Sequence, residues 1–393
     1  MSDEKSPRGA GVGITAAAAL AVALSGCGTS GGGGDAEGGM KQELGEMEGQ
    51  INILAWPGYV EDGSNDPAVD WVTPYEEQTG CKVNAKTFGT SDEAFNLMKT
   101  GDYDVVSASG DASLRLIASG AVQPVNTELL ENYAGIFDFL KNRAWNTVDG
   151  QSYGVPHGYG ANLLQYNTEV FTEAPTSWST VFTDAAEHSG QISAYDSPIY
   201  IADAALFLMA HQPDLGIENP YALDQDQFDA AVELLKEQRQ HIGEYWSDYL
   251  KLVQAFQSGD TVASTSWQVI QGVLESEGAP TAAILPEEGA TGWSDTWMIA
   301  SGSKNSNCAY AWLDYIASPE ANAMATGYFG EAPSSQAACD FREDCEAYHA
   351  GDAEYADQIW YWTTPVSECL DGRTDVECVD YAAWTKAWQE IRG

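Results

Sequence analysis

A single carboxylate between two tryptophans is the feature of this sequence best suited to chemistry. Asp295 stands between Trp293 and Trp297 in the stretch of residues 284–301, with apolar residues on either side. An indole face attracts a cation by about 0.5–2 kcal/mol, and a charge-assisted hydrogen bond to a carboxylate adds about 1.5–3 kcal/mol. The pattern therefore predicts a site for an amine. The alternative is that both tryptophans belong to the core and that Asp295 caps a turn.

Other aromatic and small polar side chains stand where short predicted strands end. They are Trp56 and Tyr59 after residues 51–55, Ser109 and Asp111 after residues 103–107, and Trp267 after residues 261–266. Open α/β sheets bind ligands at the carboxyl ends of their strands. These residues are therefore site candidates, and the alternative for the aromatic ones is ordinary packing in loops.

The elements that must position these residues alternate along the chain. We predict strands at residues 51–55, 81–88 and 103–107 and helices at residues 71–79, 91–100 and 114–120. After a glycine-rich crossing at residues 153–160, we predict strands at residues 161–166, 191–195 and 261–266 and helices at residues 178–182, 202–209, 225–240, 249–258, 308–317, 320–326 and 381–391. Alternating strands and helices indicate doubly wound α/β lobes. At 393 residues the chain exceeds the usual size of one core, so we expect two lobes.

The N-terminus carries export signals. Lys5 and Arg8 precede an apolar run at residues 11–24, which is too short to span a membrane and is typical of a signal peptide. The run ends in Leu-Ser-Gly-Cys, which resembles a bacterial lipobox, so we expect Cys27 to be diacylated. The glycine-rich segment that follows indicates a tether. We therefore expect an extracytoplasmic protein that is lipid-anchored to the cell membrane, with the lipid as its only membrane contact.

The net charge of the chain is extreme. With 59 acidic and 17 basic residues it is −42, which argues against nucleic acid or an anionic membrane surface as a partner. The acidic residues are spread over the whole chain, so the charge indicates a strongly solvated surface and says nothing about the ligand.

The remaining cysteines indicate disulfides. Six of the seven cysteines follow Cys27, and an even number in an exported chain allows 15 pairings. Cys369 with Cys378 is the pair we favour, and Cys339 with Cys345 is the next local pair. We expect no metal site, because no C-x-x-C spacing occurs and the five histidines are scattered.

No catalytic motif was found. A nucleophile elbow, a phosphate-binding glycine loop, a dinucleotide fingerprint and a zinc helix are all missing from the sequence. Carboxylates with tryptophans also suit a surface glycan-active enzyme, but among 59 acidic residues such pairs have no specificity. We therefore expect a binding protein without catalytic activity and without a cofactor.

The ordered set of segments resembles a known family. The segments are NILAWPGYV, YDVVSASG, YGVPHGYGA, TSW at Trp267, PEEGATGWSDTWMIA and YFGEAP. From residue 51 to the end, the chain resembles the extracellular solute-binding proteins of ABC importers, in particular the spermidine/putrescine-binding group. The resemblance implies the type 2 periplasmic-binding-protein fold, in which two doubly wound α/β lobes are joined by a hinge and enclose a ligand cleft.

The resemblance also sets the domain boundaries that we expect. Residues 1–26 form the signal peptide, and residues 27–50 form the lipidated cysteine and the flexible tether. The first lobe comprises residues 51–156 and 296–359. The second lobe comprises residues 157–295 and 360–393. We expect a monomer that delivers its ligand to the subunits of an ABC permease.

The resemblance implies a set of binding positions, and the chain departs from it in places. The residues that match binding positions are Trp56, Tyr59, Ser109, Trp267, Trp293 and Asp295. Ser197 and Tyr200 stand where polyamine binders of this group have carboxylates, and Asp111 replaces an aromatic residue. A polyamine needs an anion near each cationic end, because an unpaired buried ammonium is costly.

The sequence therefore leaves open which residue supplies the second carboxylate. The candidates are Asp111, Asp196 and Glu331. A polyamine such as putrescine or spermidine is the expected ligand. The alternative is a compatible solute or a zwitterionic amino acid such as γ-aminobutyrate, whose carboxylate Ser109, Ser197 and His157 could bind.

Overall fold

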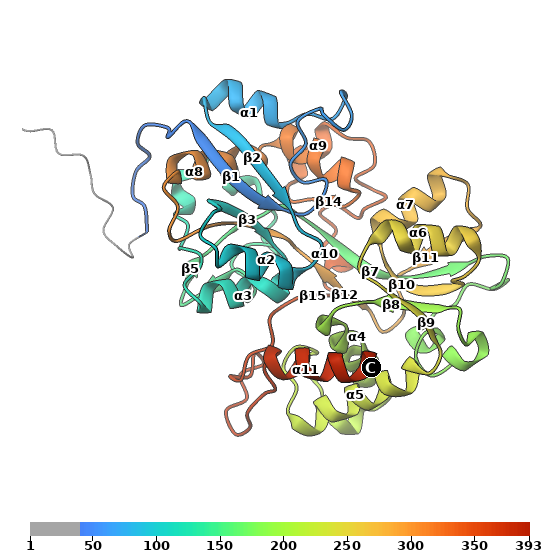
Figure 1. The fold of residues 1–393 in the computed structure, drawn as a ribbon. Coiled ribbons are helices and arrows are strands. Elements are labelled where there is room, and N and C mark those ends of the chain that lie inside the picture. Colours follow the sequence, from blue (N-terminus) through green and yellow to red (C-terminus); the bar gives the residue numbers. More distant parts are fainter. Residues whose placement is uncertain (1–39) are drawn as a thin grey trace, which may run out of the picture. The chain divides into compact units, whose positions relative to one another are not determined.

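The computed structural model describes residues 40–393. The predicted signal peptide, the predicted lipidation site Cys27 and most of the predicted tether lie outside the described residues. Two main β-sheets, each covered by helices, organise the described part of the chain (Figure 1).

The first sheet has five strands in the order β2-β1-β3-β13-β6. Their bounds are β1 Gln50–Ala55, β2 Lys82–Thr87, β3 Val105–Ala108, β6 Val155–Pro156 and β13 Thr296–Ile299. The first three run parallel, and β13 pairs antiparallel with both β3 and β6. The central strands read as apolar runs because helices cover both faces of the sheet.

The helices of the first lobe are α1 Val72–Thr79, α2 Ser91–Met98, α3 Gly110–Ala118, α8 Ser306–Ile316 and α9 Pro319–Phe329. α1 and α8 pack together on one face of the sheet, and α2 and α3 pack together on the other (Figure 1). Local sequence fixes their ends. The Thr90 side chain accepts from the Glu93 amide and caps α2, and Gly80, with φ of 73°, ends α1.

The second sheet has eight strands. Six follow the order β15-β12-β7-β10-β8-β9, and β11 and β14 also pair with β7. Their bounds are β7 Gly158–Asn167, β8 Ile192–Tyr195, β9 Ile242–Trp246, β10 Ala263–Trp267, β11 Thr281–Ile284, β12 Ala290–Trp293, β14 Ala332–Pro333 and β15 Ile359–Tyr361. The ten-residue β7 is buried along its whole length and forms the centre of this lobe.

The helices of the second lobe are α4 Ile201–His211, α5 Gln225–Arg239, α6 Tyr249–Ser258, α7 Gln268–Ser276, α10 Ala353–Ala356 and α11 Tyr381–Arg392. α4, α5 and α11 lie together on one face of the sheet, and α6 and α7 lie on the other (Figure 1). Asp224 and Gln227 form a reciprocal capping box at the start of α5.

Short elements complete the chain. They are β4 Thr147–Val148, β5 Gln151–Ser152 and the 3-10 turns Thr127–Leu129, Asn132–Gly135, Trp178–Thr180, Ala185–His188, Pro198–Tyr200, Pro213–Leu215 and Gln336–Asp340.

Three connections between the lobes are very short. His157 joins β6 to β7, Ser294 and Asp295 join β12 to β13, and Gly330 and Glu331 join α9 to β14. The connections touch one another, since the His157 amide donates to the Asp295 carbonyl at 2.8 Å. The fold therefore brings Asp295 to the boundary between the two sheets.

The element predictions were wrong at several points. Residues 178–182 contain only a 3-10 turn, and residues 242–246, for which no element was predicted, form β9. α7 was not predicted. The end of the predicted flexible tether is bound to the first lobe, because the Glu48 carboxylate accepts from the amides of Asn307 and Cys308 at the start of α8, and the Gly45 amide donates to the Asn307 side chain.

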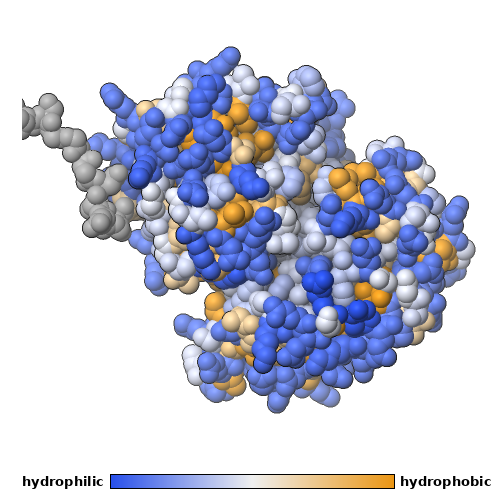
Figure 2. Space-filling model, viewed as in Figure 1, coloured by the Kyte–Doolittle hydropathy of each residue, from blue (hydrophilic) through white to orange (hydrophobic). Residues whose placement is uncertain are grey.

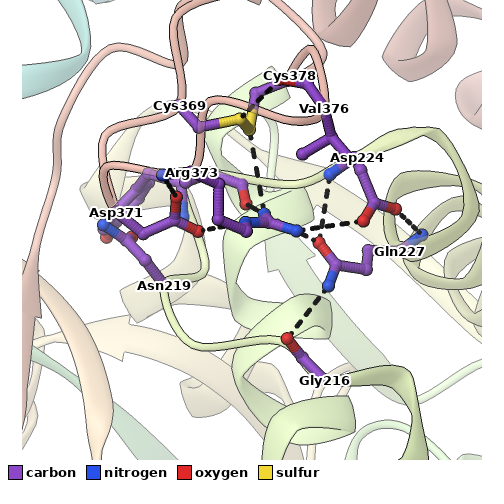
Figure 3. The surroundings of a disulfide bond; sticks show 11 residues. Gly216, Asn219, Asp224, Gln227, Cys369, Asp371, Arg373, Val376 and Cys378 are labelled. Atoms are coloured by element: carbon purple, nitrogen blue, oxygen red, sulfur yellow. Dashed lines mark hydrogen bonds and ion pairs between the residues drawn. A yellow bond between two sulfur atoms is a disulfide. The ribbon is translucent and has the colours of Figure 1, made fainter.

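Three disulfides are present among the described residues. Cys369–Cys378 and Cys339–Cys345 are the two pairs that the sequence favoured, and Cys81–Cys308 is a third that it did not predict. Figure 3 shows the first of these. Arg373, inside the loop that the disulfide closes, donates to Asp371, to the Asp224 carboxylate at 3.0 Å, to the Gln227 side chain and to the Ala222 carbonyl. The loop is thereby fixed to the start of α5.

Candidate functional site

A cavity of about 620 Å³ lies between the two lobes. Figure 2 shows the hollow between them, on a face that is otherwise mostly hydrophilic. Seven aromatic side chains line the cavity: Trp56, Phe88, Tyr249, Trp267, Trp293, Phe329 and Trp362. They come from both lobes, since Trp56 follows β1 and Phe88 follows β2, whereas Trp267 ends β10 and Trp293 ends β12. An aromatic cavity of this size suits a small organic molecule.

The charged lining of the cavity has one sign. Its carboxylates are Asp295, Glu93 and Asp248, and no Lys, Arg or His of residues 40–393 lines it. Glu93 lies in α2 of the first lobe, and Asp248 caps α6 of the second. Both are exposed, whereas Asp295 is 4% exposed. The field inside the cavity therefore favours a cation.

Asp295 is the buried carboxylate of the cavity. Its Oδ1 accepts from the Ser109 hydroxyl at 2.6 Å and its Oδ2 accepts from the Tyr59 hydroxyl at 2.8 Å. Burial raises the pKa of Asp295 to about 6, and the two hydrogen bonds oppose that rise. A buried carboxylate with two neutral donors is held in place without a counter-ion, so it can take an ammonium group.

Ser109 reaches Asp295 because of the turn from β3 into α3. The strand ends at Ala108 and the helix begins at Gly110, so Ser109 stands at the helix start. A Cβ at Gly110 would lie 1.6 Å from the Trp362 carbonyl oxygen. Only glycine allows the Trp362 backbone to pack against this turn, which helps to place the Trp362 ring at the cavity.

Two predicted binding residues lie behind the cavity wall. Tyr59 and Glu331 are fully buried, and neither lines the cavity. Tyr59 contacts both carboxylates, since its hydroxyl is 2.8 Å from Asp295 and 3.3 Å from Glu331. Glu331 accepts from Trp293 Nε1 at 2.8 Å. These two residues can act on a ligand only through Asp295 and Trp293.

Trp297 was expected to flank the cation and does not. It lies in β13 opposite Ser107 of β3, is fully buried, and donates from Nε1 to His157 Nδ1 at 3.0 Å. β12 and β13 belong to different sheets, so the indoles on the two sides of Asp295 face different surroundings. Trp293 lines the cavity and Trp297 belongs to the core.

Three further predicted positions lie outside the cavity. Asp111 is buried in the first turn of α3, where it accepts from the Ser91 hydroxyl at 2.7 Å. Burial raises its pKa to about 6. Ser197 and Tyr200 do not reach the cavity because the chain after β8 turns into α4. There Tyr200 accepts from Gln238 within the core of the second lobe.

The structure therefore brings five of the ten predicted residues to the cavity. They are Trp56, Ser109, Trp267, Trp293 and Asp295. The lining residues Phe88, Tyr249, Phe329, Trp362, Glu93 and Asp248 were not among the predicted ones. Phe88 directly follows β2, so the strand-end pattern that singled out Trp56 would also have found it, whereas Trp362 follows β15, which was not predicted. No such signal marks Glu93 or Asp248.

The comparison with protein families is decisive for the identity of the chain. Residues 70–350 match the family model described as bacterial extracellular solute-binding protein. The chain belongs to this family. This solute-binding protein has the two-lobed α/β fold that the sequence predicted, with the cavity between its lobes.

Individual relatives are similar to it at low identity. The spermidine/putrescine-binding periplasmic protein of Escherichia coli (strain K12) is 21% identical over 286 residues, which cover 72% of this chain and 76% of that protein. The solved structure of the TpPotD lipoprotein of Treponema pallidum has a TM-score of 0.70 at 17% identity and covers 87% of this chain and 99% of that one. A solved structure of a GABA receptor has a TM-score of 0.65 at 16% identity and covers 88% of this chain and 98% of that one.

The family is described as extracellular, and the Escherichia coli relative is a periplasmic protein. In the described part of the solute-binding protein, no helix is long and apolar enough to cross a membrane. Residues 40–393 also contain no group of three or more His, Cys, Asp or Glu side chains that could hold a metal ion.

Proposed function

We propose that this solute-binding protein captures a small polyamine, such as putrescine or spermidine, and delivers it to an ABC permease without a catalytic step. The observation that carries the proposal is the buried Asp295 in an aromatic cavity whose other charged groups are also carboxylates. One ammonium of the ligand would bind Asp295, and the methylene chain would lie against the rings of Trp56, Trp267 and Trp293.

The charges at the cavity favour a polyamine over a zwitterion. A zwitterionic amino acid with its ammonium on Asp295 would bring its carboxylate toward Glu93 or Asp248, which repel it. A polyamine would instead bring a second ammonium toward these carboxylates. A zwitterion is therefore the second candidate, and only the structural similarity to a GABA receptor favours it.

Ligand binding would close the cleft. Trp56 and Ser109 belong to the first lobe and Trp267 belongs to the second, so a bound amine contacts both lobes at once. Only contacts that are better in the closed form can shift the equilibrium toward it. The closed form would be the one that the permease recognises.

We propose boundaries of the lobes that agree with the pairing of the strands in the two sheets. We keep residues 51–156 and 157–295 as the first segments of the two lobes. β14 and β15 both pair with strands of the second sheet, so we place the last boundary near Glu331 rather than after residue 359. We also propose that Cys27 is lipidated and that the protein is a monomer.

Calorimetric titration of the purified protein with putrescine, spermidine and γ-aminobutyrate tests the function. The proposal predicts saturable binding of at least one polyamine and weaker or no binding of γ-aminobutyrate. Binding of γ-aminobutyrate alone would replace the polyamine by a zwitterion, and binding of none of the three would refute both. Release of sugars from mixed oligosaccharides would instead favour a glycan-active enzyme.

A further inference from the structure

The three short connections between the lobes carry ionisable side chains that lie together. His157, Asp295 and Glu331 are each at most 4% exposed. Tyr59 lies between the two carboxylates, and His157 Nε2 faces Glu331 Oε1 at 3.7 Å. Glu331 does not line the cavity, so its role in a cation site must be indirect.

The hydrogen bonds of the two carboxylates are unequal. Asp295 accepts from a hydroxyl at each of its oxygens. Glu331 accepts at Oε2 from Trp293, and among residues 40–393 its Oε1 has no hydrogen-bond partner. His157 carries its hydrogen on Nε2, because its Nδ1 accepts from Trp297. At 3.7 Å, Nε2 is nevertheless too far from Glu331 Oε1 to donate a hydrogen bond to it. A fully buried anion with so few donors is costly.

The single hydrogen of the Tyr59 hydroxyl decides between the carboxylates. It can be donated to only one of them, and the shorter distance is to Asp295, at 2.8 Å against 3.3 Å. A proton on Glu331 Oε2 would let that oxygen donate to the Tyr59 oxygen. The donors would then run in one direction, from Glu331 to Tyr59 and from Tyr59 to Asp295.

We propose that Glu331 is a positioning residue of the amine site that keeps its proton while the cleft is empty, so that Tyr59 donates to Asp295 and the negative charge stays on the cavity side. The inference rests on the proposed function, because the negative charge of Asp295 is presented to an amine. The arrangement also couples cation binding to proton release. An ammonium on Asp295 removes the repulsion that disfavours ionised Glu331, so Glu331 can then lose its proton.

The groups around Glu331 agree with this assignment. Asp295 disfavours its ionised form, and His157 stays neutral because burial lowers its pKa to about 3. The Arg342 guanidinium favours the ionised form but binds the Glu331 carbonyl rather than the carboxylate. Tyr348 and Tyr59 have raised pKa values and are neutral. Burial, followed by the charge of Asp295, raises the pKa of Glu331 to about 8.

The backbone of β7 is shaped to hold this arrangement. A Cβ at Gly158 would lie 2.6 Å from Glu331 Oε1, and a Cβ at Gly160 would lie 2.3 Å from the Trp293 ring. Residues two apart on a strand face the same side of the sheet. The two glycines therefore leave neighbouring spaces for the Glu331 side chain and for the Trp293 indole that donates to it.

Two measurements on wild type and Glu331→Gln test the inference. In infrared spectra of the ligand-free proteins at pH 7, wild type should show a protonated carboxyl C=O band in addition to that of Asp203, which both proteins share, and this additional band should disappear with a midpoint near pH 8. In titrations with putrescine at pH 8, run in buffers of different ionisation enthalpy, wild type should release a fraction of a proton and Glu331→Gln should release none.

The control is Glu288→Gln, which removes a carboxylate that binds Ser177 and His211 away from the cavity. It should match wild type in both measurements. Identical carboxyl bands in wild type and Glu331→Gln would overturn the inference, as would equal proton release. If putrescine bound to neither protein, the proposed function would fail, and the infrared spectra alone would still decide whether Glu331 holds a proton.

Discussion

The Tyr59 hydroxyl donates to the Asp295 carboxylate at 2.8 Å across a separation of 236 residues. Tyr59 follows the first strand of the first sheet, whereas Asp295 lies on a connection between the sheets. The bond stabilises the ionised form of Asp295 and so opposes the rise in its pKa that burial causes. This ionised form is the one that attracts an ammonium group.

Replacing Tyr59 by Phe should therefore weaken polyamine binding in a pH-dependent way. Without the phenol hydrogen the pKa of Asp295 rises above its present value of about 6. We expect about fivefold weaker binding at pH 6 and almost no loss at pH 8, because a rise of about one pKa unit lowers the ionised fraction of Asp295 from about one half to about one tenth at pH 6 and barely changes it at pH 8. Calorimetry at the two pH values measures this difference in affinity.

Tyr75→Phe is the control, since the Tyr75 hydroxyl donates to the Cys308 carbonyl inside the first lobe. Unchanged binding by Tyr59→Phe at pH 6 would contradict the prediction.

Replacing Gly160 by Ala should displace the Trp293 ring. The added Cβ would lie 2.3 Å from this indole, which is buried and lines the cavity, so the ring would have to move. We expect polyamine affinity to fall at least tenfold, together with a change in tryptophan fluorescence. Gly302→Ala serves as the control because a Cβ there meets no atom within 4 Å. Equal affinities of the two variants would show that the position of Trp293 does not matter for binding.

The three disulfides should contribute unequally to stability. Cys81 and Cys308 are 227 residues apart in sequence, whereas Cys339 and Cys345 are six apart. A bond that closes a longer loop restricts the unfolded chain more, so replacing the first pair by serines should cost about 5 kcal/mol and replacing the second about 2 kcal/mol. Urea unfolding of the two double variants measures the difference. Equal losses of unfolding free energy in the two double variants would mean that loop length does not determine how much each disulfide stabilises the protein.

Asp203 should make the ligand-free protein less stable as the pH rises. Burial raises its pKa from an ordinary 3.8 to about 7, and it accepts from the Thr291 hydroxyl in the core of the second lobe. A group whose pKa is raised by folding stabilises fully below the unfolded value, and this stability is lost as the pH rises through the folded value. Asp203→Asn should therefore gain stability relative to wild type between pH 5 and pH 8, on the order of 2–3 kcal/mol. A difference that stays constant over this range, measured by urea unfolding, would show that Asp203 does not titrate there.

Much of the fold could be predicted because local signals agreed with one another. The apolar run before Trp56 is buried, and Pro57 and Gly58 end it, so β1 was visible in the sequence. β9 was not, because its Gly243 and Glu244 are exposed at the edge of the second sheet and break the apolar pattern. Neighbouring strands rather than local sequence determine such an element.

The candidate site was predictable only in part, for a similar reason. Strand ends marked Trp56, Ser109 and Trp267, which the two sheets do bring to one cavity. The need for a second carboxylate placed Glu331 among the ligand contacts, although it lies behind Tyr59 and Trp293 and does not line the cavity. Whether a side chain lines a cavity or lies behind its wall depends on packing between remote segments, and sequence spacing does not encode that.

The most direct measurement compares polyamine binding by Asp295→Asn and Asp111→Asn. Both carboxylates are buried, both have a pKa of about 6 and both accept from a serine hydroxyl, but only Asp295 lines the cavity. Removing one partner of a buried charge pair costs about 2–5 kcal/mol, so calorimetry at pH 8 with putrescine and spermidine should show binding weakened at least thirtyfold in Asp295→Asn. Asp111→Asn should bind like wild type. Equal binding by the two variants, or a loss only in Asp111→Asn, would contradict the assignment of Asp295 as the group that holds the ammonium.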